Sequence, residues 1–188
     1  LQGRVLFDYA QGWPAGNLRR LWEVAYPRPF DTETKAAAAK FNFSAHHLTG
    51  LTREESLFNA GIRSTAGALG LAQLMPATAR GIATRAGVTI RTDADLLPPA
   101  NNLLLAAAYL SQLSAHFNQN PILVTGAYNA GETAIARWRA QRATLPIDLW
   151  VERLEVSETR NYIKRVLSST FAYHLLAGEP GFPRVDLK

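Results

Sequence analysis

The sequence predicts a mainly α-helical domain with little or no β-sheet. Strong helix formers recur in runs with helical periodicity, and glycines and prolines interrupt these runs at helical lengths. We find no segment with the strict apolar–polar alternation that is typical of a half-buried strand. The chain has 188 residues, of which 47% are hydrophobic and 19% charged. This composition suits one folded domain with a core, alone or with a short appendage, and excludes a disordered chain.

Prolines divide the beginning of the chain. Residues 4–26 mix aromatic and aliphatic side chains and are typical of short helices joined by a turn. The next stretch, YPRPF (Tyr26–Phe30), contains prolines that restrict their own backbone and that of each preceding residue. We therefore expect an N-terminal helical segment over residues 1–25 and a main domain over residues 26–188.

The main domain is expected to be built from successive helices. Ser44 is a candidate N-cap, Pro76 is placed to start a helix and Gly87 to end it. We expect NAGIRSTAGALG to be a loop, RTDADLLPPA a connector and LPIDLW a turn. The helical stretches are, in order, DTETKAAAAKF, SAHHLTGLTREESLF, MPATARGIATRAG, ANNLLLAAAYLSQLSAHF, PILVTGAYNAG, GETAIARWRAQR and SETRNYIKRVLSSTFAYHLLAG.

Charge and cysteine content limit the classes of function. The formal net charge is +5, which suits an anionic partner such as nucleic acid, a membrane surface or a cell-wall polymer. The basic residues are scattered, which argues against nucleic acid. The absence of cysteine excludes disulfides, thiolate metal sites and cysteine nucleophiles. No apolar run approaches the roughly 20 residues of a membrane span. The chain begins without Met or a signal peptide, so we expect a processed or excised piece.

Two adjacent glutamates, Glu54 and Glu55, end the second helical stretch. At about 100° per residue, Glu55 falls within about 30° of the centre of the apolar face and Glu54 about 80–90° from it. If Ala45 is left out and Leu57 is counted as helical and buried, the two glutamates become equivalent. Helical phase therefore favours Glu55 as the inward residue by a small margin. The apolar face is defined by Ala45, Leu48, Leu51 and Phe58.

An inward glutamate has two interpretations. Partial burial disfavours the carboxylate and raises its pKa, which suits a general acid that works near neutral pH. Alternatively the carboxylate forms a buried salt bridge, for which Arg53, Arg63 and Arg80 are the candidate partners.

Four stretches in this order resemble the signature of the lytic murein transglycosylases, in particular the soluble Slt type. REESLFNAGIRSTAGALGLAQLMPATA (Arg53–Ala79) resembles the first motif of that family, in which a Glu-Ser pair ends a helix. GAYNAG resembles its Ala-Tyr-Asn-Ala-Gly motif, and SETRNYIKRVL resembles its third motif. YPRPF resembles its Tyr-Pro entry into the catalytic domain. The resemblance covers residues 26–177.

The resemblance implies a goose-type lysozyme-like helical fold with a groove for the glycan strand of peptidoglycan. It also implies that Glu55 is the catalytic acid and base and that Glu54 stands outside the chemistry. Glu55 would protonate the glycosidic oxygen between N-acetylmuramic acid and N-acetylglucosamine while the 2-acetamido group assists. It would then deprotonate the C6 hydroxyl of the same sugar, which gives a 1,6-anhydromuramyl end without hydrolysis. One carboxylate then suffices, where ordinary glycosidases use two.

Other positions match the family one by one, each beside a structural alternative. Ser64 matches the serine near the N-acetyl group, although a loop serine also satisfies its own backbone. Tyr128, with Asn129 beside it, matches the tyrosine close to the catalytic glutamate, although a core aromatic is the alternative.

The remaining matches concern the groove. Gln73 and Met75 match groove-lining residues, with core packing as the alternative for Met75. Glu158 matches a groove-associated glutamate, or is a first-turn residue with Ser157 as the helix cap. Arg160 and Tyr162 are interpreted as structural or groove-supporting.

One position departs from the family pattern, because Ala72 stands where the family carries Met. We expect this change to remove bulk near the groove. No Asp-x-Asp-x-Asp-Gly loop and no HExxH motif occur, so neither a metal nor a cofactor is expected. His46 and His47 are interpreted as surface or packing residues that face different ways.

The resemblance also bears on context. It implies peptidoglycan glycan strands as the substrate, the bacterial periplasm or cell envelope as the location, and wall-synthesis or secretion machinery as candidate partners. Residues 1–25 would then be the end of a preceding superhelical region. Two alternatives stay open: a hydrolytic goose-type lysozyme and a non-catalytic glycan-binding or scaffold domain.

Overall fold

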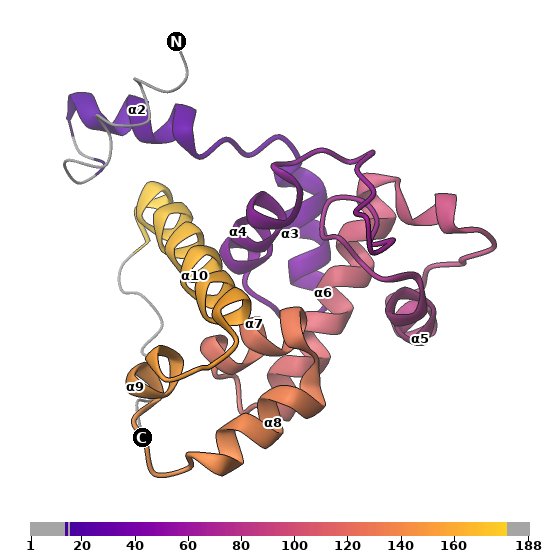
Figure 1. Cartoon of the computed structure of the whole chain (residues 1–188). Helices are drawn as coiled ribbons and strands as arrows, with labels where there is room; N and C mark the ends of the chain where they lie inside the picture. Colours follow the sequence, from indigo (N-terminus) through magenta and orange to yellow (C-terminus); the bar gives the residue numbers. More distant parts are fainter. Residues whose placement is uncertain (1–13, 15, 180–188) are drawn as a thin grey trace.

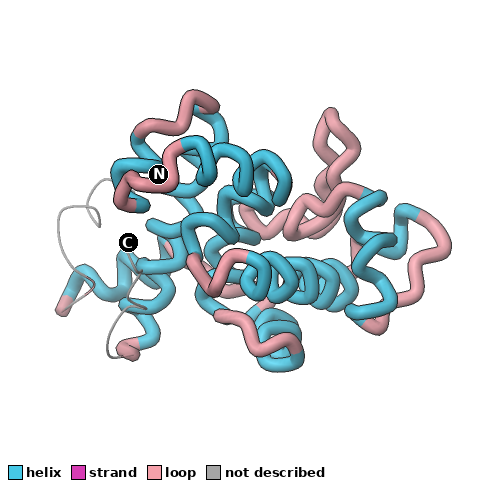
Figure 2. The backbone as a smooth tube through the Cα atoms, turned by 90° about the horizontal axis from the view of Figure 1, so that it is seen from below, coloured by secondary structure: helices cyan, strands magenta, loops and turns pink. Residues whose placement is uncertain are grey.

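The computed structural model describes residue 14 and residues 16–179. Most of the expected residues 1–25 segment lies outside this range, apart from α2 (Asn17–Ala25). The described residues form helices joined by loops, with no strand and only two isolated bridges, Arg63 to Leu69 and Leu69 to Leu74 (Figure 2). The prediction of a mainly α fold is confirmed.

The helices of the main domain follow the predicted stretches closely. They are α3 (Asp31–Lys40), α4 (Ala45–Ser56), α5 (Pro76–Ala86), α6 (Pro99–His116), α7 (Pro121–Ala130), α8 (Glu132–Gln141), α9 (Ile147–Glu152) and α10 (Ser157–Ala177), with a short 3-10 helix η1 (Asp93–Leu96). The expected N-cap is present, since the Ser44 side chain accepts a hydrogen bond from the His47 backbone N–H. Gly87 ends α5 in the left-handed conformation, as expected.

Two local predictions are wrong. Residues 147–150 of LPIDLW form the first part of helix α9 rather than a turn, because Ile147, Trp150 and Val151 on its apolar face are buried in the core. The N-cap of α10 is Val156, so Ser157 is the first helical residue and not the cap. The expected connector before α6 is present and contains the short helix η1.

The centre of the fold is the packing of α4 against α10, which lie side by side in Figure 1. The two helices run antiparallel, since Gly50 meets Thr170 in the middle while Glu55 meets Tyr162 at one end. A Cβ built on Gly50 would lie 2.8 Å from the Thr170 backbone nitrogen, so this close approach requires glycine. The close approach fixes which α10 residues reach the end of α4.

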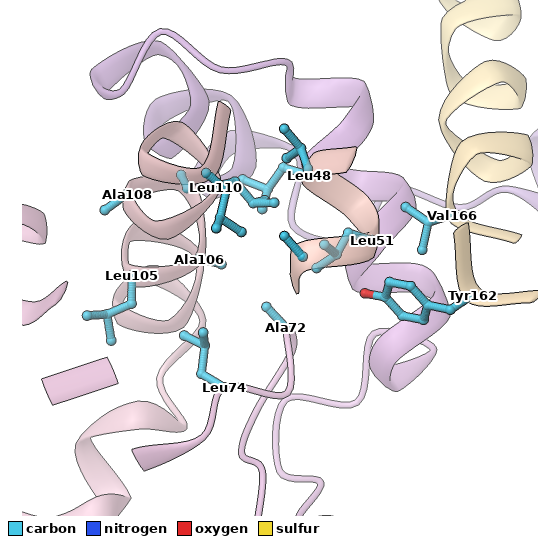
Figure 3. Packing of buried hydrophobic residues seen from close by; sticks show 14 of the residues in the cluster. Leu48, Leu51, Ala72, Leu74, Leu105, Ala106, Ala108, Leu110, Tyr162 and Val166 are labelled. Atoms are coloured by element: carbon cyan, nitrogen blue, oxygen red, sulfur yellow. The ribbon is translucent and has the colours of Figure 1, made fainter. Parts of the chain in front are cut away.

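A continuous apolar core supports this pair. Leu48 and Leu51 of α4 are fully buried together with Val166 of α10, and α6 packs against the other side of the core (Figure 3). Tyr162 is 4% exposed and lies in the same cluster. The site at the end of α4 is therefore built on a rigid, packed framework.

Candidate active site

Glu55 lies in the last turn of α4, against α10. The helix ends at Ser56, and Leu57 is left-handed and 76% exposed. Leu57 is thus neither helical nor buried, which removes the condition under which the two glutamates would be equivalent. The Tyr162 hydroxyl donates a hydrogen bond of 2.5 Å to Oε1 of Glu55. The inward carboxyl is therefore held by a buried tyrosine from the neighbouring helix.

Glu54 has a different environment from its neighbour. Its Oε1 atom accepts a hydrogen bond of 2.7 Å from Arg53 and one of 2.6 Å from the Ser169 hydroxyl. Arg165 lies 3.5 Å from its Oε2 atom. The salt-bridge interpretation therefore applies to Glu54, which lines a surface pocket with Tyr26, Arg53 and Arg165.

The electrostatic balance leaves Glu55 poised near neutral pH. Burial raises the pKa of Glu55 to about 7, against the stabilising hydrogen bond from Tyr162 and the positive charge of Arg165, and with a small addition from Glu54. Within the described part of the chain Glu55 forms no ion pair. Arg80, one of the expected partners, pairs instead with Asp93. A carboxyl with this pKa can both give and take a proton at neutral pH.

Tyr128 lies close enough to Glu55 for their charges to interact. Burial and the Glu55 charge both raise the pKa of Tyr128 well above its usual value. Its hydroxyl donates a hydrogen bond of 2.8 Å to the Ala72 carbonyl, and its ring contacts that of Tyr109 with centroids 5.5 Å apart. Tyr128 therefore joins α7 to the loop that follows Glu55, with its hydroxyl already satisfied.

Ser64 and Gln73 lie in the loop between α4 and α5. The Ser64 hydroxyl oxygen accepts a bond of 2.9 Å from the Ala68 N–H, which leaves its own proton to donate. The Gln73 side-chain nitrogen donates to the carbonyls of Ile62, at 3.3 Å, and Gly70, at 2.8 Å. Both side chains therefore brace the loop that carries them.

Asn102 of α6 holds this loop from beneath and was not recognised in the sequence. It is fully buried, its oxygen accepts from the Ala72 N–H at 2.7 Å, and its nitrogen donates to the Leu69 and Leu96 carbonyls at 3.0 and 2.7 Å. A Cβ on Gly70, whose φ is +74°, would lie 2.4 Å from that nitrogen. The signal in the sequence that could have identified Asn102 is a single polar residue on the buried face of an apolar helix.

The other predicted positions are distributed around this centre. Met75 is 44% exposed, so core packing is the wrong interpretation for it. Asn129 accepts a hydrogen bond of 2.8 Å from the Thr159 hydroxyl, which joins the end of α7 to the start of α10. Glu158 is exposed in the first turn of α10, one turn from Tyr162 on the same face. Arg160 donates to the Leu154 carbonyl, which is a structural contact.

Ala72, the departure from the family pattern, is fully buried. The expectation that it removes bulk near the groove stays a prediction. Its backbone, and not its side chain, connects to the site, through Asn102 and Tyr128. A small residue at this position fits the close packing of the loop on α6.

Two residues of α10 belong to the surroundings of Glu55: Tyr162, which the sequence marked only as structural or groove-supporting, and Arg165, which it did not single out. Both act on the charge of Glu55, and both lie on α10, more than 100 positions later in the chain. Within the described residues, one group of side chains could hold a metal ion: His46, His174 and Glu179. That group lies at the other end of the α4–α10 pair, away from Glu55.

In this helical fold the half-buried carboxyl of Glu55 has a raised pKa and accepts a hydrogen bond from the buried Tyr162. Such a carboxyl is able to give and take a proton near neutral pH. Comparison with known proteins gives the family. The transglycosylase SLT domain model matches residues 33–151, and this chain belongs to that family.

Relatives of known name agree with the family assignment. The soluble lytic murein transglycosylase of Salmonella typhimurium is 31% identical over 168 residues, which cover 88% of this chain and 26% of that protein. The chain thus spans about a quarter of the length of this curated relative.

Solved structures show the same fold. An inactive glutamate-to-glutamine mutant of lytic transglycosylase Slt from Pseudomonas aeruginosa superposes with a TM-score of 0.80 at 31% identity, over 88% of this chain and 26% of that chain. The 70 kDa soluble lytic transglycosylase from Escherichia coli gives a TM-score of 0.81 at 26% identity, over 93% of this chain and 30% of that one. The predicted lysozyme-like transglycosylase fold is confirmed.

Proposed function

We propose that this domain cleaves the β-1,4 bond between N-acetylmuramic acid and N-acetylglucosamine in peptidoglycan without hydrolysis, and leaves 1,6-anhydromuramyl ends. The observation that supports it most is Glu55: a half-buried carboxyl with a pKa of about 7 that forms no ion pair within the described residues. Membership of the transglycosylase SLT family supports the reaction class.

In the proposed mechanism Glu55 acts first as an acid. Its protonated form, favoured by burial, gives a proton to the glycosidic oxygen while the 2-acetamido group of the muramyl residue stabilises the developing charge at C1. Tyr162 donates to Glu55, so the carboxylate that results from this step is stabilised. The leaving sugar departs with the proton.

Glu55 then acts as a base on the same sugar. The carboxylate takes the proton of the C6 hydroxyl and so becomes a protonated carboxyl again. The C6 oxygen bonds to C1 in the same step. Intramolecular attack has a high effective molarity and competes well with water. The pKa of about 7 serves both steps, because neither protonation state is strongly disfavoured at neutral pH.

We further propose that Ser64, Gln73, Met75, Tyr128, Asn129 and Glu158 contact the glycan strand. The exposed Met75 and Glu158 offer an apolar and an acidic contact on the surface. The proposal for Tyr128 is supported by its electrostatic interaction with Glu55. The net charge of +5 favours approach to an anionic wall polymer, and the periplasm or cell envelope is the proposed location.

The described residues contain no helix long and apolar enough to cross a membrane. Wall-synthesis or secretion machinery remains the proposed class of protein partner.

The test is a matched pair of variants on purified sacculi. Glu55→Gln keeps the size of the side chain and removes its proton chemistry, so muropeptide release is expected to fall by at least about 100-fold. Glu54→Gln makes the same change at the adjacent residue and is expected to retain activity within about tenfold. Equal activity in wild type and Glu55→Gln would refute the role of Glu55. An inactive wild type would favour the non-catalytic binding domain.

A further inference from the structure

Three potential metal ligands meet at the end of the α4–α10 pair opposite to Glu55. His46 lies in the first turn of α4, His174 in the last turn of α10, and Glu179 directly after the glycine that ends α10. Glu55 follows His46 by nine positions, which is about 13 Å along a helix. The antiparallel packing thus brings together residues separated by more than 120 positions in the sequence.

Their atoms converge. The Glu179 Oε1 atom lies 3.0 Å from Nε2 of His46, and its Oε2 atom lies 3.7 Å from Nδ1 of His174. One ligand atom from each residue lies within 4.8 Å of the other two. Tetrahedral zinc, with bonds near 2.0–2.2 Å, sets its ligand atoms roughly 3.3 Å apart. Side-chain movements of about 1 Å would bring the three residues to that spacing.

The surroundings suit a bound ion with access from solvent. The His46 and His174 side chains are 18% and 11% exposed and their rings pack edge to face, while Glu179 is 56% exposed. His47, by contrast, is buried and its Nε2 atom lies 3.0 Å from the Thr125 hydroxyl, so it faces another way, as the sequence indicates. The two histidines are thus held in the packed helix pair, and the more exposed carboxylate closes the site.

We propose that His46, His174 and Glu179 bind a divalent transition metal, with zinc as the preferred ion. Two imidazoles and a carboxylate suit zinc, copper and nickel and disfavour magnesium and calcium, which prefer oxygen ligands. Zinc accepts three protein ligands with water in the fourth position. The exposed side next to Glu179 supplies that position.

Such an ion would act on stability and not on the chemistry of Glu55. It would tie the chain after α10 to the beginning of α4, and so fasten the helix pair that presents Tyr162 to Glu55 at its other end. The inference does not depend on the proposed catalytic function. The alternative is a plain histidine–carboxylate ion pair, as His116 and Glu132 form at 3.1 Å elsewhere on the surface.

The experiment is calorimetric titration of the metal-free chain, without a histidine tag, with zinc and separately with magnesium at pH 7.5. We expect one zinc per chain, no magnesium binding, and a rise in Tm of several degrees in saturating zinc. His46→Ala and Glu179→Gln are each expected to weaken zinc binding at least tenfold. Circular dichroism checks that each variant is folded, and the exposed Glu179 is the position at which a substitution disturbs the packing least.

Two controls separate this site from others. His116→Ala removes a histidine from an isolated His–Glu pair and should bind zinc as tightly as the wild type. Glu55→Gln should also bind zinc normally, so a failure of the proposed function leaves this result intact. Absence of zinc binding at about 100 µM metal would overturn the proposal in favour of an ion pair. Zinc binding by His46→Ala and Glu179→Gln that is as tight as in the wild type would do the same.

Discussion

Removal of the Tyr162 hydroxyl should shift the pH dependence of activity in a predictable direction. Tyr162→Phe deletes a donor that lies 2.5 Å from Glu55 and lowers the pKa of that carboxyl. A hydrogen bond to a charged group contributes about 1.5–3 kcal/mol, and part of it persists when the carboxyl is protonated. A net preference for the carboxylate of about 1.4 kcal/mol corresponds to one pKa unit, so the variant should have a Glu55 pKa of about 8.

The assay is the pH profile of kcat/KM on solubilised glycan strands. The first step requires protonated Glu55, so wild-type activity should fall as the pH rises through about 7. In Tyr162→Phe this fall should occur near pH 8, with activity at pH 6 reduced by less than about tenfold.

A matched control makes this prediction specific. Tyr173→Phe removes a buried hydroxyl from the same helix, where it donates a bond of 2.9 Å to the Pro27 carbonyl. It should lower stability while the alkaline fall in activity stays near pH 7. An unchanged profile in Tyr162→Phe, or equal shifts in the two variants, would refute the assignment of Tyr162 as the residue that tunes Glu55.

Three further predictions concern stability, each measured by denaturant unfolding. Because the pKa of Glu55 is raised in the folded state, the contribution of its carboxyl to stability is greatest below about pH 4.5 and is lost as the pH rises through about 7. The free energy of unfolding of Glu55→Gln should therefore gain roughly 3 kcal/mol relative to that of the wild type between pH 4.5 and pH 8. A difference that stays constant with pH would contradict this. Glu54→Gln should lower the free energy of unfolding by about 1–2 kcal/mol, because it weakens a largely buried contact with Arg53 and Ser169. An unaltered denaturant midpoint would count against that contact. Asn102→Ala should lose about 3–5 kcal/mol, because three backbone groups lose their partner, whereas a loss below about 1 kcal/mol would show that the loop is held by other contacts.

Helical periodicity and cap residues were sufficient to predict most of the helices, whereas the lysozyme-like arrangement of these helices was expected only from the family resemblance. Ser44 and Gly87 mark their helix ends through local interactions that act in the sequence itself. The helix α9 was missed because its six residues are too few for a periodic signal, and burial of Trp150 stabilises it through tertiary contacts. Helix propensity cannot report such contacts.

The candidate site was only partly predictable, for a related reason. The phase of α4 favoured Glu55 by a margin that depended on whether Leu57 is helical and buried. Only the structure settles this, because α4 ends before Leu57, which is left-handed. Tyr162 and Asn102 reach the site from α10 and α6, so their roles depend on how distant helices pack. The pKa of Glu55 likewise follows from burial, which no local pattern in its own helix specifies.

The central proposal is that Glu55 directs the C6 hydroxyl of the same sugar, and not water, to C1. Digestion of sacculi in water enriched in heavy oxygen tests this most directly, with the muropeptides analysed by mass spectrometry. We predict products with anhydromuramyl ends, lighter by one water than reducing ends and without heavy oxygen, and their loss in Glu55→Gln. Reducing ends that carry heavy oxygen at C1 would contradict the proposal and identify a hydrolytic muramidase.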